Sequence, residues 1–119
     1  MKATGIDAVY FAVTDVPRAK TFYSGLLDVA EVTMESEHAV EFVLRDGSAF
    51  GFGKYSHEKW VPSGCVLFHV DDADAAAQSI ASLGGRLLGE VRDFPNCRAQ
   101  WCEDPDGNSL VLHQRKAGA

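Results

Sequence analysis

The tetrapeptide Val13-Thr14-Asp15-Val16 is echoed by Val70-Asp71-Asp72-Ala73, at an offset of 57 residues (70 − 13). Further along, Asp46-Gly47-Ser48 is echoed by Asp106-Gly107-Asn108, at an offset of 60 residues (106 − 46). Similarity that recurs at a nearly constant spacing indicates a duplicated structural unit. The sequence therefore predicts two related units, and the second has gained about three residues between these landmarks (60 − 57).

Each unit is expected to begin with a strand that leads into a helix. The stretch 6–13 is apolar and β-branched, and Asp15 after it can cap a helix. The second unit repeats this pattern with a strand at 65–70, a cap at Asp72 and a helix stop at Gly84-Gly85. The apolar residues at helical spacing are Val16, Ala19, Phe22, Tyr23 and Leu26 in the first unit and Ala73, Ala76, Ile80 and Leu83 in the second.

Shorter strands are expected to follow each helix, so that both units have the order β-α-β-β-β. We predict an α+β fold in which two tandem βαβββ units form a curved mixed sheet around a cavity. A single domain is expected over 1–119, with units at about 1–54 and 64–116 and a linker at 55–63.

Charge and composition exclude several kinds of partner. The net charge is −6, and no run of Lys or Arg is longer than Arg115-Lys116, so we expect no nucleic-acid partner. No apolar stretch is long enough to span a membrane, and the N-terminal residues lack a signal-peptide core, so a cytoplasmic location is expected. The three cysteines, Cys65, Cys97 and Cys102, are an odd number and are expected to be reduced.

The predicted strands have two unlike faces, because successive side chains of a strand point to opposite sides. One face is bulky and is expected to pack under the helices: Val9, Phe11, Val13, Phe50, Phe52, Val66, Phe68, Val70, Leu110 and Leu112. The other is small or polar: Ala8, Tyr10, Ala12, Ala49, Gly51, Gly53, Cys65, Leu67, His69, Ser109, Val111 and His113. Small residues leave space, so we expect the second face to line a cavity, or else to admit another sheet or subunit.

Two motifs resemble those of a known superfamily. Ile6-Asp7-Ala8-Val9, followed by Val13-Thr14-Asp15 and Phe22-Tyr23, looks like the opening of the vicinal oxygen chelate superfamily. Asp104-Pro105-Asp106-Gly107-Asn108 before an apolar strand resembles its closing signature. The resemblance covers nearly the whole chain. Members include glyoxalase I, extradiol dioxygenases, and bleomycin- and fosfomycin-resistance proteins, so it implies the same duplicated fold.

The resemblance also implies where a metal would be bound. In metal-dependent relatives the ligands lie on the first and last strand of each unit, at positions that correspond here to Ala8, Gly51, Cys65 and Val111. Ala, Gly and Val offer no donor atom, and one thiol cannot replace four ligands. We therefore predict no metal at these positions and expect no cofactor, while a divalent metal at a relocated site stays open.

Two histidines lie on the predicted cavity face. His69 and His113 have three possible roles: ligands of a relocated metal, polar contacts or acid–base catalysts for a bound molecule, or ordinary hydrogen-bonded core. Cys65 is either a nucleophile or a packed thiol.

Aromatic and apolar residues complete the predicted binding site. Tyr10, Trp60 and Trp101 are the candidate aromatic contacts, because aromatic walls stack planar or cationic ligands. Leu67 and Val111 share the cavity face with them, and Glu41 and Glu103 are candidate acidic residues at its rim.

The function predicted from these features is small-molecule binding. We expect a metal-free protein of the bleomycin-resistance type, which sequesters an aromatic or cationic ligand such as a drug. The alternatives are a lyase, isomerase or dioxygenase that uses a relocated metal or His69 or His113, and a structural module with a vestigial cavity. A homodimer is expected, with the cavity built within one chain or across two.

Overall fold

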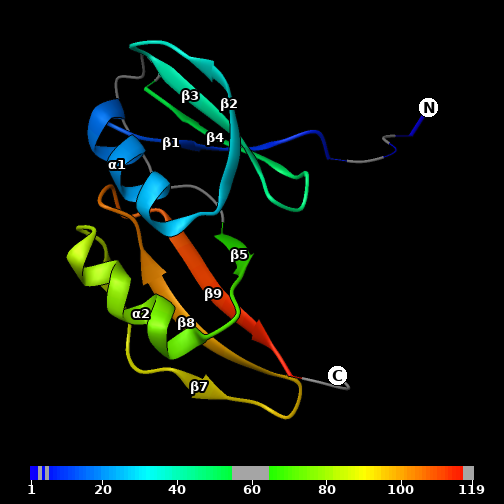
Figure 1. Ribbon diagram of the computed structural model, residues 1–119, viewed down its shortest axis with the longest axis vertical. Coiled ribbons are helices and arrows are strands. Elements are labelled where there is room, and N and C mark those ends of the chain that lie inside the picture. The colour runs from blue at the N-terminus through cyan, green and yellow to red at the C-terminus, as the bar shows by residue number, and fades with distance from the viewer. Residues whose placement is uncertain (3, 5, 55–64, 117–119) are drawn as a thin grey trace.

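The computed structural model describes residues 1, 2, 4, 6–54 and 65–116 (Figure 1). Neither helix in these residues has the length and apolar character needed to cross a membrane. The elements, in chain order, are β1 (Val9–Ala12), α1 (Val16–Leu26), β2 (Val29–Glu35), β3 (Ala39–Leu44), β4 (Ala49–Gly53), β5 (Cys65–His69), α2 (Ala73–Ser82), β6 (Arg86–Leu87), β7 (Arg92–Asp93), β8 (Cys97–Glu103) and β9 (Ser109–Arg115).

The strands form two mixed sheets, one in each unit. The first has the order β1-β4-β3-β2, and the second has the order β5-β9-β8-β6 with β7 also paired to β8. In each sheet the first strand of the unit runs parallel to its last strand, and the remaining pairs are antiparallel. The predicted α+β class and the duplicated order are confirmed, with one short strand more in the second unit and with two sheets in place of a single curved one. The linker expected at 55–63 lies outside the described residues.

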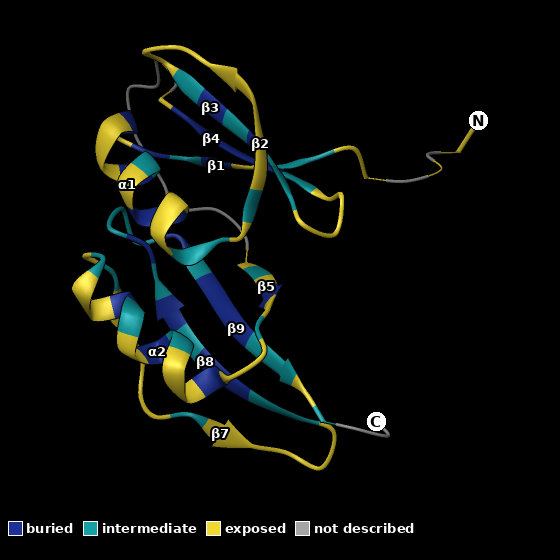
Figure 2. Ribbon diagram, viewed as in Figure 1, coloured by how far each residue is buried: buried dark blue, intermediate teal, exposed yellow. Residues whose placement is uncertain are grey.

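The bulky strand face packs under the helices, as predicted. α1 contacts β3 and β4, while α2 contacts β8 and β9. The core beneath them is rich in aromatic rings; for example, Tyr23 stacks on Phe52 at 5.3 Å between ring centroids. Phe50 of the first unit meets Phe68 of the second edge to face at 5.2 Å, which joins the two cores. Figure 2 shows the buried strands under helices whose outer surface is exposed.

Both helices begin where the sequence predicts. Asp15 accepts a hydrogen bond from the backbone N–H of Arg18, and Asp72 accepts from the N–H groups of Asp74 and Ala75. Each carboxylate thereby satisfies backbone donors that a helix start leaves unpaired. Gly84 ends the second unit's helical segment with φ +92°, a conformation that favours glycine.

The first strand is shorter than predicted. We expected it to begin at Ile6, but β1 begins at Val9, and the Ile6 side chain is exposed. The pairing explains the difference, because the β1–β4 ladder begins at Val9 opposite Phe50. An apolar sequence alone does not make a strand without a partner to accept its hydrogen bonds.

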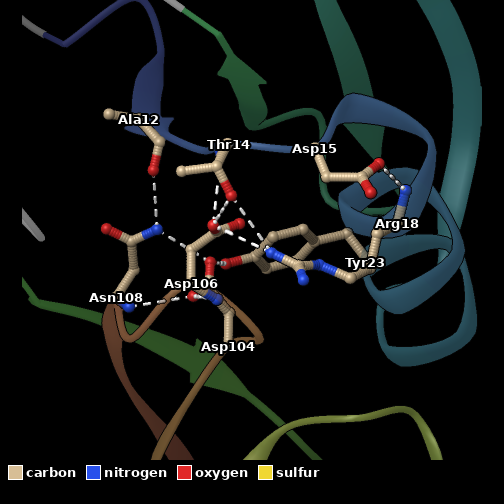
Figure 3. Close-up of polar contacts among 8 residues, drawn as sticks. All are labelled: Ala12, Thr14, Asp15, Arg18, Tyr23, Asp104, Asp106 and Asn108. Atoms are coloured by element: carbon tan, nitrogen blue, oxygen red, sulfur yellow. Dashed lines mark hydrogen bonds and ion pairs between the residues drawn. The ribbon is translucent and has the colours of Figure 1, made fainter. Parts of the chain in front are cut away.

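The closing turn of the second unit binds the first unit (Figure 3). Asp106 Oδ1 accepts hydrogen bonds from the backbone N–H and the hydroxyl of Thr14 and forms an ion pair with Arg18 at 3.0 Å. Asn108 Nδ2 donates to the carbonyl of Ala12 at 2.9 Å. We call this set of contacts the Asp106 lock, because it joins turn β8–β9 to the end of β1 and the start of α1.

A buried phenol reinforces the lock. The Tyr23 hydroxyl donates to Asp104 Oδ2 at 2.7 Å, and Asn108 Nδ2 donates to the same carboxylate. Burial, with the adjacent negative charge of Asp104, raises the pKa of Tyr23 well above its usual range. The phenol therefore stays protonated in the folded protein at pH values where an unfolded chain would lose that proton.

Replacing this phenol is expected to change how stability depends on pH. In the wild type, the unfolded state ionises Tyr23 above pH ~10 and the native state does not, so stability should fall as pH rises beyond that value. Tyr23→Phe removes this loss, and at pH 7 it should cost about 1–3 kcal/mol because a buried carboxylate loses a donor. Urea denaturation of both proteins from pH 7 to 11 measures the two effects, and parallel pH profiles would contradict the assignment.

Candidate functional site

On the face of the first sheet away from the helices, Tyr10 crosses Gly51 to reach Glu41. Tyr10 and Glu41 both lie opposite Gly51 in the strand register. The Tyr10 hydroxyl donates to Glu41 Oε1 at 2.6 Å, and the Thr33 hydroxyl donates to Oε2 at 3.0 Å. We call Tyr10 and Glu41 the Tyr10–Glu41 pair. The pair presents one aromatic ring and one carboxylate together on the open face of the sheet.

Glycine is required beneath the ring. A Cβ at Gly51 would lie 2.6 Å from Tyr10 Cζ and 2.9 Å from the carbonyl oxygen of Val40. Both distances are shorter than van der Waals contact allows. The sequence identified Tyr10 and Gly51 on one face and Glu41 at the rim, and the structure brings all three into one row.

The second sheet places the predicted histidines side by side. His69 lies directly opposite His113 in the parallel β5–β9 ladder, so their strands are about 4.8 Å apart. The next row joins Leu67 to Val111, which in turn lies opposite Trp101. His69 Nε2 also lies 3.6 Å from a carboxylate oxygen of Asp71. The two imidazoles therefore share one face, as the strand alternation predicts.

Trp101 has neighbours that the sequence did not reveal. The guanidinium of Arg92 lies over its ring, 5.0 Å from the centroid, and Phe94 packs edge to face at 6.3 Å. Arg92 is thus a cation already bound to the aromatic wall where we expected a ligand to stack. No sequence signal pairs them, because Arg92 and Trp101 meet only through the β7–β8 ladder. Trp60, the other candidate tryptophan, lies outside the described residues.

A cavity of ≈ 740 Å³ lies between the two units, at the start of α2 and the end of α1. Of the predicted site residues it contains Leu67 and His69. Tyr10, Val111 and His113 lie on the open sheet faces and do not line it. Its walls are Val9, Leu26, Leu27, Asp28, Leu44, Arg45, Asp46, Ser48, Ala49, Phe50, Val66, Leu67, Phe68, His69, Val70, Asp71, Asp72, Ala75 and Ala76.

The family model of the glyoxalase-like domain matches residues 8–113, which is most of the chain and both units. The chain belongs to the glyoxalase-like family. This places it in the vicinal oxygen chelate superfamily, as its opening and closing motifs predicted. No functionally curated protein matches the sequence of this glyoxalase-like domain.

Solved structures share the fold at low sequence identity. A protein from Agrobacterium tumefaciens has a TM-score of 0.81 at 22% identity and covers 97% of this chain and 100% of its own. A glyoxalase/bleomycin resistance protein from Albidiferax ferrireducens has a TM-score of 0.79 at 19% identity, covering 93% and 98%. The fosfomycin resistance protein of Listeria monocytogenes, solved with Mn(II) and sulfate, has a TM-score of 0.77 at 16% identity, covering 98% and 94%.

The donor set of this glyoxalase-like domain does not fit the metal that such relatives hold. The four corresponding positions, Ala8, Gly51, Cys65 and Val111, supply a single thiol, and the Tyr10 ring covers Gly51. Within 6–54 and 65–116 no three His, Cys, Asp or Glu side chains are grouped to hold an ion. One or two donors are too few for the tetrahedral or octahedral sites that divalent metals prefer, so we derive no chemistry through a metal here.

The cysteines differ in their surroundings. Cys65 is exposed at the start of β5, whereas Cys102 is buried, and burial raises the pKa of its thiol to about 12. Cys102 is therefore protonated at neutral pH and does not act as a nucleophile. Cys65 stays a candidate contact on the open face of the second sheet.

A double-mutant cycle tests the contact of Tyr10 with Gly51. Gly51→Ala should destabilise the protein by about 1–3 kcal/mol, because the new methyl group overlaps the ring and the Val40 carbonyl. In a Tyr10→Ala background the ring is gone, so the same change should cost less. Urea denaturation of the wild type, both single variants and the double variant gives the coupling energy. Additive effects would show that the ring does not lie over Gly51.

Proposed function

We propose that this protein is a metal-free small-molecule binding protein, which sequesters an aromatic or cationic ligand on the open faces of its sheets. The observation that carries the proposal is the Tyr10–Glu41 pair. An organic cation is attracted both by the face of an aromatic ring and by a carboxylate. The hydrogen bond between Tyr10 and Glu41 fixes both groups before any ligand arrives, which lowers the entropy cost of binding.

The second sheet supplies the apolar part of the proposed site. Leu67 is 58% exposed and Trp101 is partly exposed in the same row, whereas Val111 between them is buried and supports them from below. Such side chains favour a ligand with an apolar or planar body, because its burial releases water from both surfaces. Arg92 covers one face of Trp101, so that face is not available to a ligand unless Arg92 moves.

The relatives support a binding role for this fold. One similar structure is described as a glyoxalase/bleomycin resistance protein, and others as fosfomycin resistance proteins. A drug or a similar natural product is therefore our proposed ligand class. The unsuitable donor set at Ala8, Gly51, Cys65 and Val111 favours sequestration over metal-dependent chemistry. The free thiols are consistent with a reducing compartment, and we propose the cytoplasm.

A second candidate function is acid–base catalysis without a metal. The observation that favours it is the row of His69 and His113, with Asp71 3.6 Å from His69. Two imidazoles and a carboxylate on one face suit proton transfer in a lyase or isomerase reaction. The two proposals differ in outcome, because a binder returns its ligand unchanged.

The binding proposal is tested with metal-free bleomycin, a cationic drug with planar aromatic rings. Native mass spectrometry and Trp fluorescence titration should detect a complex, and the drug should be recovered unaltered. Glu41→Gln should weaken binding about five- to tenfold, since it removes the charge and keeps the shape. Glu37→Gln, at another exposed glutamate, is the matched control. Equal affinities for the two variants, or drug consumption that His113→Ala abolishes, would contradict the proposal.

We further propose that a second copy of the chain covers the open faces. Tyr10, Leu67 and Phe94 are exposed apolar or aromatic residues from both units, and exposed patches of this kind mark interaction surfaces. Sheets from two copies would enclose the ligand that one open face cannot surround.

Light scattering after size exclusion tests the assembly. The wild type is expected at twice the chain mass of 12.9 kDa. Leu67→Glu should give monomers, because the interface would have to bury an unpaired charge. Ile6→Glu, at another exposed apolar residue before β1, should leave the dimer intact. A monomeric wild type at all concentrations would rule out the dimer.

A further inference from the structure

The junction between the units has two halves that are related by the internal repeat. One half is the Asp106 lock, in which Asp106 binds Thr14 and the guanidinium of Arg18. The repeat offsets of 60 and 57 residues assign each member a counterpart in the other half. These counterparts are Asp46 for Asp106, Ser48 for Asn108, Asp71 for Thr14 and Ala75 for Arg18.

The second half lacks the groups that close the first. Ala75 has no cation to offer Asp46, and Asp71 presents a carboxylate where Thr14 presents a hydroxyl. Asp46 instead accepts hydrogen bonds from the N–H and the hydroxyl of Ser48, within its own turn. No cation here joins the turn to the start of α2, and the two sides present carboxylates of like charge, which do not attract each other.

The cavity of ≈ 740 Å³ lies at this open half. Asp46 and Ser48 line one side of it, and Asp71 and Ala75 line the other. In the counterpart half, the lock brings Thr14 and Arg18 into direct contact with Asp106. The cavity therefore lies where the second unit has Ala75 in place of the arginine that closes the first half of the junction.

The walls of the cavity combine apolar surface with acidic edges. Phe50 and Phe68 meet edge to face within it, and Leu26, Leu27 and Val66 extend this apolar surface. The ionisable groups that line it are Asp28, Arg45, Asp46, His69, Asp71 and Asp72.

The cationic side chain among these groups, Arg45, is already paired, and the imidazole of His69 has a carboxylate neighbour. Arg45 is held by Asp28 through two hydrogen bonds, at 2.9 and 3.1 Å, so its charge does not offset Asp46. His69 lies 3.6 Å from Asp71. Carboxylates thus exceed cations around the cavity, and those on its two sides are Asp46 and Asp71.

We propose that this cavity is a second binding site, which takes an amphipathic organic cation. The guanidinium or ammonium of the ligand lies between Asp46 and Asp71, as Arg18 lies at Asp106, and its apolar body lies against Phe50 and Phe68. This site is distinct from the Tyr10–Glu41 pair, which does not line the cavity.

The test uses phenethylguanidine and its neutral isostere phenethylurea as probes. Amide chemical shifts at Ala49, Val66 and Ala76, which line the cavity, should saturate together as the guanidine is added, so they report this site separately from binding at the Tyr10–Glu41 pair. The urea should bind at least tenfold more weakly. Asp46→Asn and Asp71→Asn should each weaken guanidine binding about five- to tenfold, because each removes one of the two charges.

Three further variants test whether the guanidine binds between the two aspartates. Ala75→Arg supplies within the chain the guanidinium that Arg18 supplies in the other half, so it should abolish probe binding and raise the melting temperature. Glu31→Gln controls for overall charge and Glu41→Gln for the other site, and in both variants the shifts at Ala49, Val66 and Ala76 should titrate with the guanidine as they do in the wild type. Equal shifts at these three amides with the two probes, shifts there that survive Asp46→Asn with Asp71→Asn, or no saturation of them at about 5 mM would overturn the proposal.

Discussion

One buried carboxylate oxygen accepts three of the polar contacts that join the two halves of this molecule. Asp106 Oδ1 accepts from Thr14 twice and pairs with Arg18, although these partners lie in the other repeat. The Asp106 side chain is only 3% exposed, so its charge has left water and depends on these partners for compensation. The contacts fix the turn between β8 and β9 against the start of α1. The relative orientation of the two sheets, and of the faces that we assign to ligand binding, follows from this attachment.

Duplication followed by divergence explains why the molecule is asymmetric. Both units kept the helix cap, at Asp15 and Asp72, because each helix needs its own backbone donors satisfied. The junction between the units does not need its polar contacts in both halves, because the Asp106 lock joins the units in one half. The other half of the junction can therefore have Ala75 in place of an arginine and leave a cavity there. The same freedom applies to the sheet faces, where one unit carries a tyrosine with a glutamate and the other carries two histidines.

Local patterns in the sequence predicted much of the fold, and long-range contacts account for what they missed. Strand alternation and helical spacing depend on neighbouring residues, so the buried face and both caps could be assigned directly. The same alternation put His69 and His113 on one face, but their position opposite each other depends on the β5–β9 register, which the sequence alone does not predict. The pairing of Glu41 with Tyr10 could not be predicted, because it depends on the register of three strands. Arg92 over Trp101 was missed for the same reason, and the late start of β1 reflects a ladder that begins only at Phe50.

The ring over Gly51 has a consequence for how this lineage can evolve. A metal site of the superfamily type would need a carboxylate at Gly51, according to the superfamily pattern. Any side chain there meets the Tyr10 ring and, beneath it, the backbone carbonyl of Val40, which no substitution can remove. A donor at Gly51 thus becomes acceptable only after the tyrosine has been lost and the neighbouring strand has shifted. A donor at position 51 therefore requires at least two coordinated changes, one in the side chain of residue 10 and one in the backbone beside it.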